Sequence, residues 1–330
     1  MGLARFAADV ASENMLTLMV LRSDRHHAIV KKIEVSGAYD VSGCVRVFTH
    51  EDIPGANRFG IITKDQQLLA ADKVRCIGDP VCLVAAESRE AAEKAVKAIK
   101  IVYEELPAVF DAEDALRDGA PRIHAKGNEL GRRVIHKGNP AMAFERADIV
   151  VERVYRTHHL EHAYLEPDAG LAYLDENGAL VIVASTQNPH YDRKEVAELL
   201  GLEEEQVRII QAPTGGGFGS KLDLNVQGFV GLATFLLGKP TKMIYTREEA
   251  FLATAKRHPL KIYYKSGADC EGRLCAVDVK IIGDTGAYAS YGLAVVSRSA
   301  VHATGPYEVP NVHIESIFAY TNNPFSGAMR

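Results

Sequence analysis

Four glycines stand within five residues of one short segment, between an expected strand and an expected apolar helix. The segment is Thr214–Lys221 (TGGGFGSK); Val207–Ile210 precedes it as a strand, and the helix is expected from about Leu224 to Gly238. Because glycine has no Cβ, the backbone N–H groups of such a loop can approach a ligand closely, and the N-terminus of the following helix adds a partial positive charge. A tight turn alone explains three consecutive glycines poorly, since each costs conformational entropy when it is ordered. The segment therefore predicts a ligand-binding loop.

The loop differs from two familiar phosphate-binding sequences. A P-loop has glycine directly before its lysine and serine or threonine directly after it, whereas here Ser220 precedes Lys221 and Leu222 follows. A dinucleotide-binding fingerprint that begins at Gly215 requires glycine at position 220, which is serine. A nucleotide phosphate bound by this loop alone is therefore disfavoured.

The remaining sequence predicts a protein of mixed α and β structure in two domains. In residues 1–108, short apolar strands surround one clear helix, as in a small α/β layer unit. Periodicity is lost over residues 109–138, where Pro, Gly, Asp and Arg dominate, and we expect a connector there. Strands and helices return in residues 139–330, the expected second domain, where Asp192 and Glu195 form a capping-box pattern at the start of one helix.

Composition excludes several classes of protein. The chain has 38 Lys and Arg against 43 Asp and Glu, a net charge of −5, which argues against a protein that binds a phosphate backbone. The longest apolar stretch, around Val226 to Gly238, is too short to cross a bilayer, and the residues after Met1 do not predict a leader. The five cysteines are odd in number and form no C-x-x-C pair, so they predict reduced thiols. We therefore expect a cytoplasmic protein that binds neither nucleic acid nor membrane.

Two polar segments of the second domain are candidate parts of a site. Ser185–His190 (STQNPH) follows a strand end, and Gln187 can both donate and accept hydrogen bonds, so it could hold a metal oxo group or an amide. Taken alone, this segment fits a strand exit that leads into a helix better. His158–Glu166 (HHLEHAYLE) is rich in histidine, but it lacks the H-E-x-x-H arrangement and a nearby cysteine pair. A wall of a cleft is therefore favoured over a zinc site.

Arg298 stands among the apolar residues Leu293–Ala300, and a buried guanidinium needs a partner. The sequence leaves two partners open, a substrate and an internal carboxylate. No Ser-His-Asp, Cys-His or paired-carboxylate arrangement has a recognisable spacing. From the residues alone, the chain has one backbone-lined ligand loop and no evident acid, base or nucleophile.

Several long segments follow one another in the order of a known family. In the second domain they are EHAYLEPDAGLAYLDENGALVIVASTQNPH, QAPTGGGFGSK, TREEAFLATAKRHP, GDTGAYASYG and TNNPFSGAMR. Together they resemble the molybdenum-binding subunit of the xanthine dehydrogenase and aldehyde oxidase family of molybdenum hydroxylases. The earlier segments VLRSDRHHA, DIPG, DKVRCIGDPVCLVAAES and IVYEELPAV resemble the hammerhead domain of that family. The resemblance implies the α+β class, with an N-terminal α/β hammerhead domain followed by the first part of the molybdenum cofactor-binding domain.

The resemblance implies cofactor-binding roles for five residues. Gln187 matches the glutamine that contacts the oxo ligand of the molybdenum. Gly217, Phe218 and Gly219 match the loop that touches the molybdenum centre and its pterin dithiolene. Arg330 matches an arginine that helps to bind the cofactor. The molybdenum itself is expected to be held by the pterin, without a metal ligand from this chain.

The substrate class also follows only from the resemblance. Arg298 matches a position that faces the substrate in the xanthine-oxidising branch. Leu222 stands where that branch has a substrate-binding glutamate, so ordinary xanthine recognition is not expected. The segments NRFGIITKDQQLLAADKVRCIGDP and YTNNPFSGAMR look closest to the nicotinate dehydrogenase type, which implies an N-heteroaromatic acid as substrate.

In this family the glutamate that acts as general base lies in a later half of the molybdenum subunit, so we expect that base outside this chain. The chain would then be a truncated subunit or one half of a split subunit, and it is not expected to turn over alone. The expected cofactors are a molybdopterin in the cytosine dinucleotide form, with [2Fe–2S] clusters and FAD on partner subunits. The expected partners are the C-terminal half of the molybdenum subunit, an iron–sulfur subunit and an FAD subunit.

The expected reaction is oxidation of a C–H bond in a nicotinate- or purine-like substrate. Water supplies the oxygen, and the electrons pass to the partner subunits. Two alternatives stay open: an aldehyde-oxidising member of the family, and a non-catalytic docking fragment without cofactor.

Overall fold

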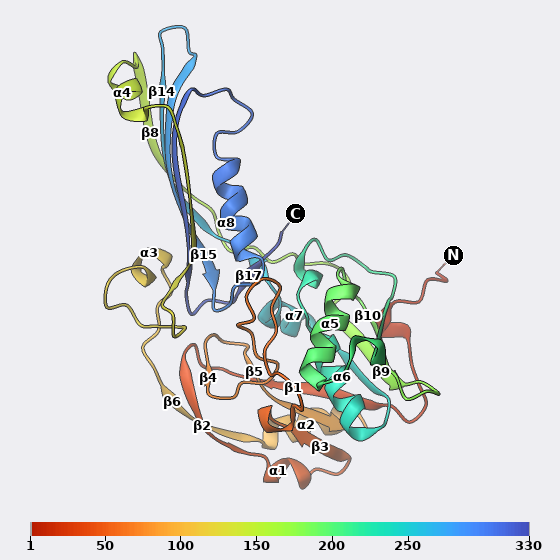
Figure 1. Cartoon of the computed structure of the whole chain (residues 1–330). Helices are drawn as coiled ribbons and strands as arrows, with labels where there is room; N and C mark the ends of the chain where they lie inside the picture. Colours follow the sequence, from red (N-terminus) through yellow and green to blue (C-terminus); the bar gives the residue numbers. More distant parts are fainter. Residues whose placement is uncertain (1, 330) are drawn as a thin grey trace. The chain divides into compact units, whose positions relative to one another are not determined.

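The computed structural model describes residues 2–329 and separates them into two compact units, whose helices and strands are shown in Figure 1. Unit 1 comprises residues 2–107, 161–255 and 329, and unit 2 comprises residues 108–160 and 256–328. Both units combine sheets with helices, in agreement with the predicted α+β class. Each compact unit joins parts of the chain that are distant in sequence, so the units do not coincide with the two predicted sequence domains.

The main sheet of unit 1 has seven strands, in the spatial order β11 (Val207–Gln211), β10 (Leu180–Ala184), β9 (Ala169–Leu174), β12 (Thr241–Ile244), β1 (Leu16–Arg22), β5 (Pro80–Ala86) and β3 (Cys44–Phe48). In this sheet β12 is parallel to β1, with Thr241 opposite Leu16. A smaller sheet has the order β4 (Lys73–Val74), β2 (Ala28–Glu34) and β6 (Lys100–Glu105). The seven-stranded sheet is therefore built from both ends of the unit's sequence.

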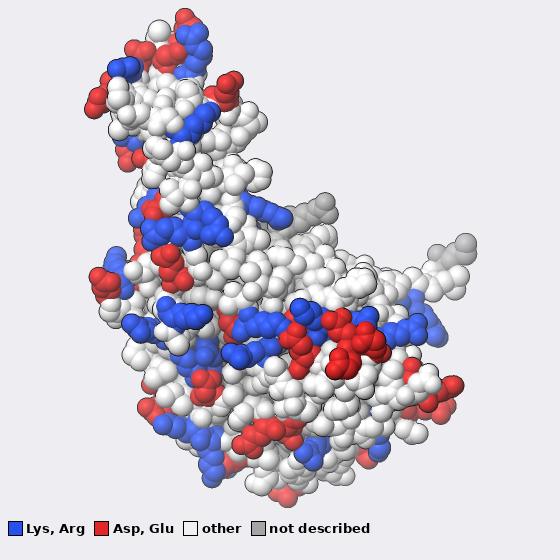
Figure 2. All heavy atoms as spheres, in the orientation of Figure 1, with Lys and Arg blue, Asp and Glu red and all other residues white. Residues whose placement is uncertain are grey.

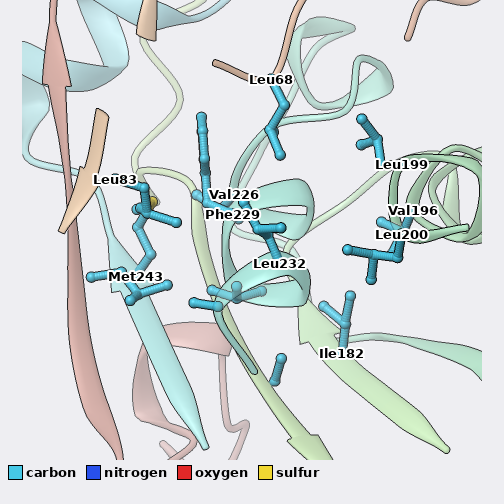
Figure 3. Close-up of a cluster of buried hydrophobic side chains, with 14 of the residues drawn as sticks. Leu68, Leu83, Ile182, Val196, Leu199, Leu200, Val226, Phe229, Leu232 and Met243 are labelled. Carbon is cyan, nitrogen blue, oxygen red and sulfur yellow. The ribbon is translucent and has the colours of Figure 1, made fainter. Parts of the chain in front are cut away.

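The helices of unit 1 are α1 (Ser36–Tyr39), α2 (Arg89–Ala98), α5 (Pro189–Leu200), α6 (Val226–Leu237) and α7 (Arg247–Ala253). In Figure 3, α6 lies between α5 on one side and strands β5 and β12 on the other, and the labelled side chains of this core include Leu83, Val196, Leu199, Leu200, Val226, Phe229, Leu232 and Met243. A Cβ on Gly231 would lie only 3.2 Å from Ile182 of β10, so glycine allows α6 to approach the sheet closely. This packing fixes the helix that follows the glycine loop.

Helix α5 begins earlier than the capping-box pattern predicts. Its N-cap is Asn188, and Pro189 fits the first helical position because the N–H that proline lacks would be unpaired there. Asp192 and Glu195 are therefore not a capping box at the start of the helix; both are buried within it. The helix ends at Gly201, which adopts a left-handed φ of 66°, as a glycine stop requires.

Unit 2 is built on a five-stranded sheet in the order β7 (Glu129–Lys137), β16 (Asn311–Tyr320), β15 (Leu274–Gly286), β14 (Leu260–Ala268) and β8 (Ile149–Arg156). Three helices accompany it, α3 (Ala112–Ala115), α4 (Pro140–Glu145) and α8 (Gly292–Val301), and the short strands β13 (Lys256–Arg257) and β17 (Ser326–Gly327) form a separate pair. All eight residues of the edge strand β8 are exposed.

Strand β7 lies in the stretch expected to be a connector. It pairs with β16 along its length, with Lys137 opposite Val312 and Gly131 opposite Phe318. As an edge strand it is largely exposed, so polar residues occupy positions that would be apolar in an inner strand. For this reason hydrophobic periodicity did not reveal it.

The surface carries charges of both signs. In Figure 2, acidic and basic side chains are interspersed over the face in view. Among residues 2–329, no helix is both long enough and apolar enough to cross a membrane. All five cysteines are free of disulfides.

Candidate functional site

The glycine loop of unit 1 runs from the end of β11 to the short 3₁₀ helix η4 (Ser220–Leu222). Its φ angle is 95° at Gly216, 50° at Phe218 and 110° at Gly219. Glycine adopts such left-handed values freely, whereas at Phe218 they are uncommon and mark a constrained backbone. The side chain of Phe218 is 51% exposed. The loop thus presents an aromatic ring outward from a tightly wound backbone.

Gln187, just beyond the end of β10, is bound to this loop at two points. Its backbone N–H donates to the carbonyl of Lys221 at 2.8 Å, and its Oε1 accepts the N–H of Gly219 at 3.0 Å. A Cβ on Gly217 would overlap the Gln187 side chain, so this approach requires glycine. Since Oε1 is occupied, the Nε2 group is the free end of the amide, and it donates to none of the residues 2–329.

The loop also leaves backbone donors free. Gly215 and Gly219 donate to side chains, but the N–H groups of Gly216, Gly217 and Phe218 bond to no other residue in the described part of the chain. Three unpaired N–H groups beside a side-chain amide form a set of donors suited to the oxygen or sulfur atoms of a bound ligand. The structure thus brings together Gln187, Gly217, Phe218 and Gly219, the four described residues to which the family resemblance assigns a cofactor-binding role, and all four lie in unit 1.

An ion pair between Lys221 and Glu166, whose side chains are largely buried, supports the glycine loop. Lys221 is 1% exposed, and its Nζ donates to the carbonyl of Glu166 (2.8 Å), to Oε2 of Glu166 (3.0 Å) and to Oγ of Ser185 (2.7 Å). The same Oε2 accepts the N–H of Gly215 at 2.7 Å and the hydroxyl of Ser185 at 2.8 Å. The Lys221 ammonium also lies 4.6 Å from the centre of the Tyr164 ring.

A second hydrogen-bonded chain continues from Tyr164. Its hydroxyl donates to Oδ2 of Asp168 at 2.5 Å, and Nδ2 of Asn225 donates to Oδ1 of the same carboxylate at 3.4 Å. The Tyr245 hydroxyl donates to Oδ1 of Asn225 at 2.6 Å and accepts from Arg22 at 2.7 Å. Burial raises the pKa of Asp168 and the pKa of both tyrosine hydroxyls. The network therefore forms a rigid polar wall beside the loop.

The sequence did not reveal this support. In the sequence, Lys221 mattered only for the comparison with the P-loop pattern, and Glu166 only as a member of the histidine-rich segment. Their side chains meet although they are 55 residues apart in sequence. The one feature of the sequence that connects Lys221 and Glu166 is that both lie in segments that resemble the same family.

The histidine-rich segment does not form a metal site in the structure. His158 and His159 belong to unit 2, whereas His162 and Glu166 belong to unit 1. His159 Nε2 lies 3.6 Å from Oδ2 of Asp284 within unit 2. No three His, Cys, Asp or Glu residues of the described chain are grouped so that they could hold a metal ion.

Three other predicted residues have different surroundings. Arg298 lies on α8 of unit 2 and is exposed, so the premise of a buried guanidinium was wrong, and it has no side-chain partner among residues 2–329. α8 is amphipathic, with Val296 and Ala300 buried and Arg298 on the solvent side. Leu222 is half-buried at the end of η4, directly after the ion-paired Lys221. Arg330 lies outside the described residues.

Comparison with known families agrees with this geometry. The molybdopterin cofactor-binding domain family matches residues 123–330, and the a/b hammerhead domain of aldehyde oxidase and xanthine dehydrogenase matches residues 1–107. The chain belongs to the xanthine dehydrogenase and aldehyde oxidase family. The predicted order, a hammerhead domain followed by a molybdenum cofactor-binding domain, is confirmed, and the chain is a component of an oxidoreductase of this family.

Two curated relatives span the whole chain. The nicotinate dehydrogenase large molybdopterin subunit of Eubacterium barkeri is 50% identical over 330 residues, which cover 100% of this chain and 78% of the relative. A subunit of a probable xanthine dehydrogenase of Bacillus subtilis is 40% identical over 329 residues, which cover 100% of this chain and 44% of the relative. The chain thus spans most of the first relative and less than half of the second.

Solved structures of the family have the same fold. The aldehyde oxidoreductase from Desulfovibrio gigas superposes with a TM-score of 0.96 at 28% identity, covering 100% of this chain and 38% of that one. Quinoline 2-oxidoreductase from Pseudomonas putida 86 superposes with a TM-score of 0.91 at 30% identity, covering 100% of this chain and 44% of that one.

Proposed function

We propose that this chain supplies one wall of the molybdenum cofactor site in a molybdenum hydroxylase. The observation that carries the proposal is the donor set of the glycine loop: the free N–H groups of Gly216, Gly217 and Phe218 beside the free Nε2 of Gln187. The match of residues 123–330 to a molybdopterin cofactor-binding domain supports the same assignment. A molybdopterin has the oxygen and sulfur acceptors that such donors require.

When bound, the molybdenum cofactor supplies a two-electron oxidation in which water is the source of the oxygen added to the substrate. This chain's own contribution is positioning. Gln187 donates through Nε2 to the cofactor because Oε1 is held by Gly219. The exposed ring of Phe218 excludes water from the reacting face, and Arg330 binds the cofactor from the end of the TNNPFSGAMR segment.

The proposed substrate is an N-heteroaromatic acid similar to nicotinate. Two observations support it: the 50% identity to a nicotinate dehydrogenase subunit, and an apolar residue, Leu222, directly after the loop lysine. Arg298 is proposed as a substrate-binding residue from the family resemblance alone, since the positive charge of its guanidinium suits an anionic substrate. The fold similarity to the Desulfovibrio gigas aldehyde oxidoreductase favours an aldehyde as the second candidate.

The proposed holoenzyme contains further chains. The general base, a glutamate, comes from a polypeptide that completes the molybdenum subunit, and electrons leave through [2Fe–2S] clusters and FAD on other subunits. The pterin carries a cytosine dinucleotide. The 50% identity to a protein named as a large molybdopterin subunit supports an assembly of several subunits.

Gly217→Val in the complex assembled with its native partner subunits tests the cofactor site. Because a Cβ at this position overlaps Gln187, the substitution displaces that amide from the loop, and we expect molybdenum and pterin content to fall about tenfold or more. Metal analysis and pterin fluorescence measure the loss. Gly178→Ala is the matched control: it changes a left-handed glycine where a Cβ meets nothing within 4 Å, at the opposite end of β10. Unchanged molybdenum content in Gly217→Val contradicts the proposal.

A second variant tests Gln187 itself. Gln187→Ala removes the donor without crowding the loop, so the complex should keep its fold while kcat falls. A fully active Gln187→Ala complex would remove this residue from the site. If the unaltered complex contains iron but no molybdenum, the chain is a docking fragment instead.

A further inference from the structure

Lys221 directs all of its hydrogen-bonding capacity into the protein. An ammonium has three N–H donors, and those of Lys221 are taken up by the carbonyl of Glu166, the carboxylate of Glu166 and the hydroxyl of Ser185. Its exposure of 1% leaves no face for a ligand. The lysine of this loop is therefore not a ligand for a cofactor phosphate, although a glycine-rich loop followed by lysine suggests that role.

The ion pair instead joins the segments on which the candidate site stands. Oε2 of Glu166 accepts from Lys221, from Ser185 at the end of β10 and from the backbone of Gly215 in the loop. Two residues after Ser185, Gln187 donates its backbone N–H to the carbonyl of Lys221. One carboxylate oxygen and one ammonium thus link the segment that follows β10, which carries Gln187, to both ends of the glycine loop.

Stability alone gives no reason for such a pair. Replacing a buried ion pair with well-packed neutral residues is often neutral or stabilising, because the charges must be desolvated. Neutral replacements, however, cannot hold Gly215, Ser185 and the carbonyl of Glu166 in the same geometry. A shift of a few tenths of an ångström there would move the free donors of Gly216 to Phe218 relative to Nε2 of Gln187.

We propose that Lys221 and Glu166 are positioning residues of the molybdenum cofactor site, which set the distance between Gln187 and the glycine loop. The proposal rests on the proposed function of that loop. Neither residue touches the cofactor; they act through the hydrogen bond from Gly219 to Gln187 and through the loop backbone at Gly215.

The decisive variant is the double substitution Lys221→Met with Glu166→Gln. It removes both charges, so no isolated charge is left buried, and the chain should fold with a melting temperature within about 3 °C of the unaltered protein. The matched control is Lys64→Met with Glu195→Gln, which removes another ion pair of unit 1, between Lys64 and Glu195 of helix α5 at an N–O distance of 3.0 Å. That pair contacts neither the glycine loop nor Gln187. Lys64 also pairs with Glu198, which is 40% exposed, so water can solvate that carboxylate in the control.

Two readouts distinguish positioning from a purely structural role. In the full chain without cofactor, amide hydrogen exchange of Gly215 and Gly219, the loop amides that donate to Glu166 and Gln187, should accelerate about tenfold or more in the double variant and stay unchanged in the control. Exchange in α6 should be the same in both. In the assembled complex, molybdenum content should fall about tenfold to a hundredfold in the double variant only.

The outcomes are separable. A double variant that keeps both the amide exchange rates of Gly215 and Gly219 and its molybdenum overturns the positioning role. Loop exchange that accelerates while molybdenum content stays at the level of the unaltered complex also overturns it, because the loop geometry then does not matter to the cofactor. If the unaltered complex itself holds no molybdenum, the proposed function fails, and the exchange experiment still decides whether the pair sets the loop.

Discussion

In each unit a carboxylate holds a glycine-containing segment by accepting hydrogen bonds, Glu166 in unit 1 and Asp284 in unit 2, but the two carboxylates are neutralised in different ways. In unit 1, Glu166 meets the buried ammonium of Lys221 at 3.0 Å. In unit 2, Asp284 accepts from neutral donors: the N–H of Gly286 at 2.7 Å, the hydroxyl of Thr321 at 2.6 Å and the amide of Asn323 at 2.7 Å. A half-exposed histidine, His159, lies 3.6 Å from the same carboxylate.

The two carboxylates therefore have different structural roles: Glu166 links segments that are distant in sequence, whereas Asp284 holds its own turn and one other segment. The donors to Asp284 come from its own turn and from the TNNPFSGAMR segment, so this carboxylate holds one neighbouring segment in place. Glu166 and Lys221 connect three segments, and each has a unit charge that only the other compensates. Removal of Asp284 should therefore leave neutral donors without an acceptor. Removal of either Lys221 or Glu166 leaves the other with an uncompensated charge.

The largest effect outside the ion pair is expected for Asp284→Ala. Asp284 is 5% exposed, and its loss leaves two buried donors, Gly286 and Thr321, and the half-buried amide of Asn323 without this acceptor. Unit 2 should therefore lose about 5 kcal/mol of its free energy of unfolding. Amide hydrogen exchange of β15 and β16 measures unit 2 separately from unit 1. Asp284→Asn is the control, because one oxygen remains as acceptor, and a loss of about 1 to 2 kcal/mol is expected. Equal stability of Asp284→Ala and the unaltered chain would show that the hydrogen bonds to Asp284 do not stabilise unit 2.

Local chemistry and the family resemblance led to different parts of the candidate site. Glycines between a strand and a helix indicated a ligand loop. For Gln187 the local pattern favoured an ordinary strand exit, and only the family resemblance implied a role in the site. The structure brings these residues together. What local chemistry could not predict was which distant side chains meet, as for Glu166 and Lys221. A lone carboxylate and a lone lysine each have an ordinary explanation at the surface.

The errors in the fold prediction have one physical cause, which is that burial was inferred from neighbours in sequence. Strand β7 is exposed at a sheet edge, so it lacked the apolar pattern by which strands were found. Arg298 has apolar neighbours along the chain, but the turn of α8 places it on the solvent side. Asp192 looked like an exposed cap and is buried inside α5. In each case, tertiary packing decided the environment.

That buried Asp192 gives unit 1 a characteristic pH dependence. Burial is the main cause that raises the pKa of Asp192 to about 7; the negative charge of Asp223 contributes to the rise, and hydrogen bonds from Thr186 and Gln227 oppose it. Between about pH 4 and pH 7 the folded chain holds a proton that the unfolded chain has lost, so stability falls as the pH rises through this window. Asp192→Asn should remove this fall, which amounts to at most about 4 kcal/mol. Hydrogen exchange of α5 at pH 5 and pH 8 measures it, and an equal pH response of both proteins contradicts the prediction.

Unit 2 should respond to pH in the opposite direction, through His258. This histidine is 4% exposed, and burial lowers its pKa to about 4, although the nearby charge of Asp284 partly opposes that shift. Between about pH 4 and pH 6.5 the unfolded chain binds a proton that the folded chain excludes, so the stability of unit 2 falls as the pH drops through this window. His258→Gln should flatten the response by about 3 kcal/mol. Exchange of β15 at pH 7 and pH 5 provides the measurement, with α5 as internal reference. The contrary result is that acid lowers the protection of α5 and β15 from exchange equally in the unaltered chain, with no change in His258→Gln. That result would show that Asp192 and His258 do not cause opposite pH responses in the two units.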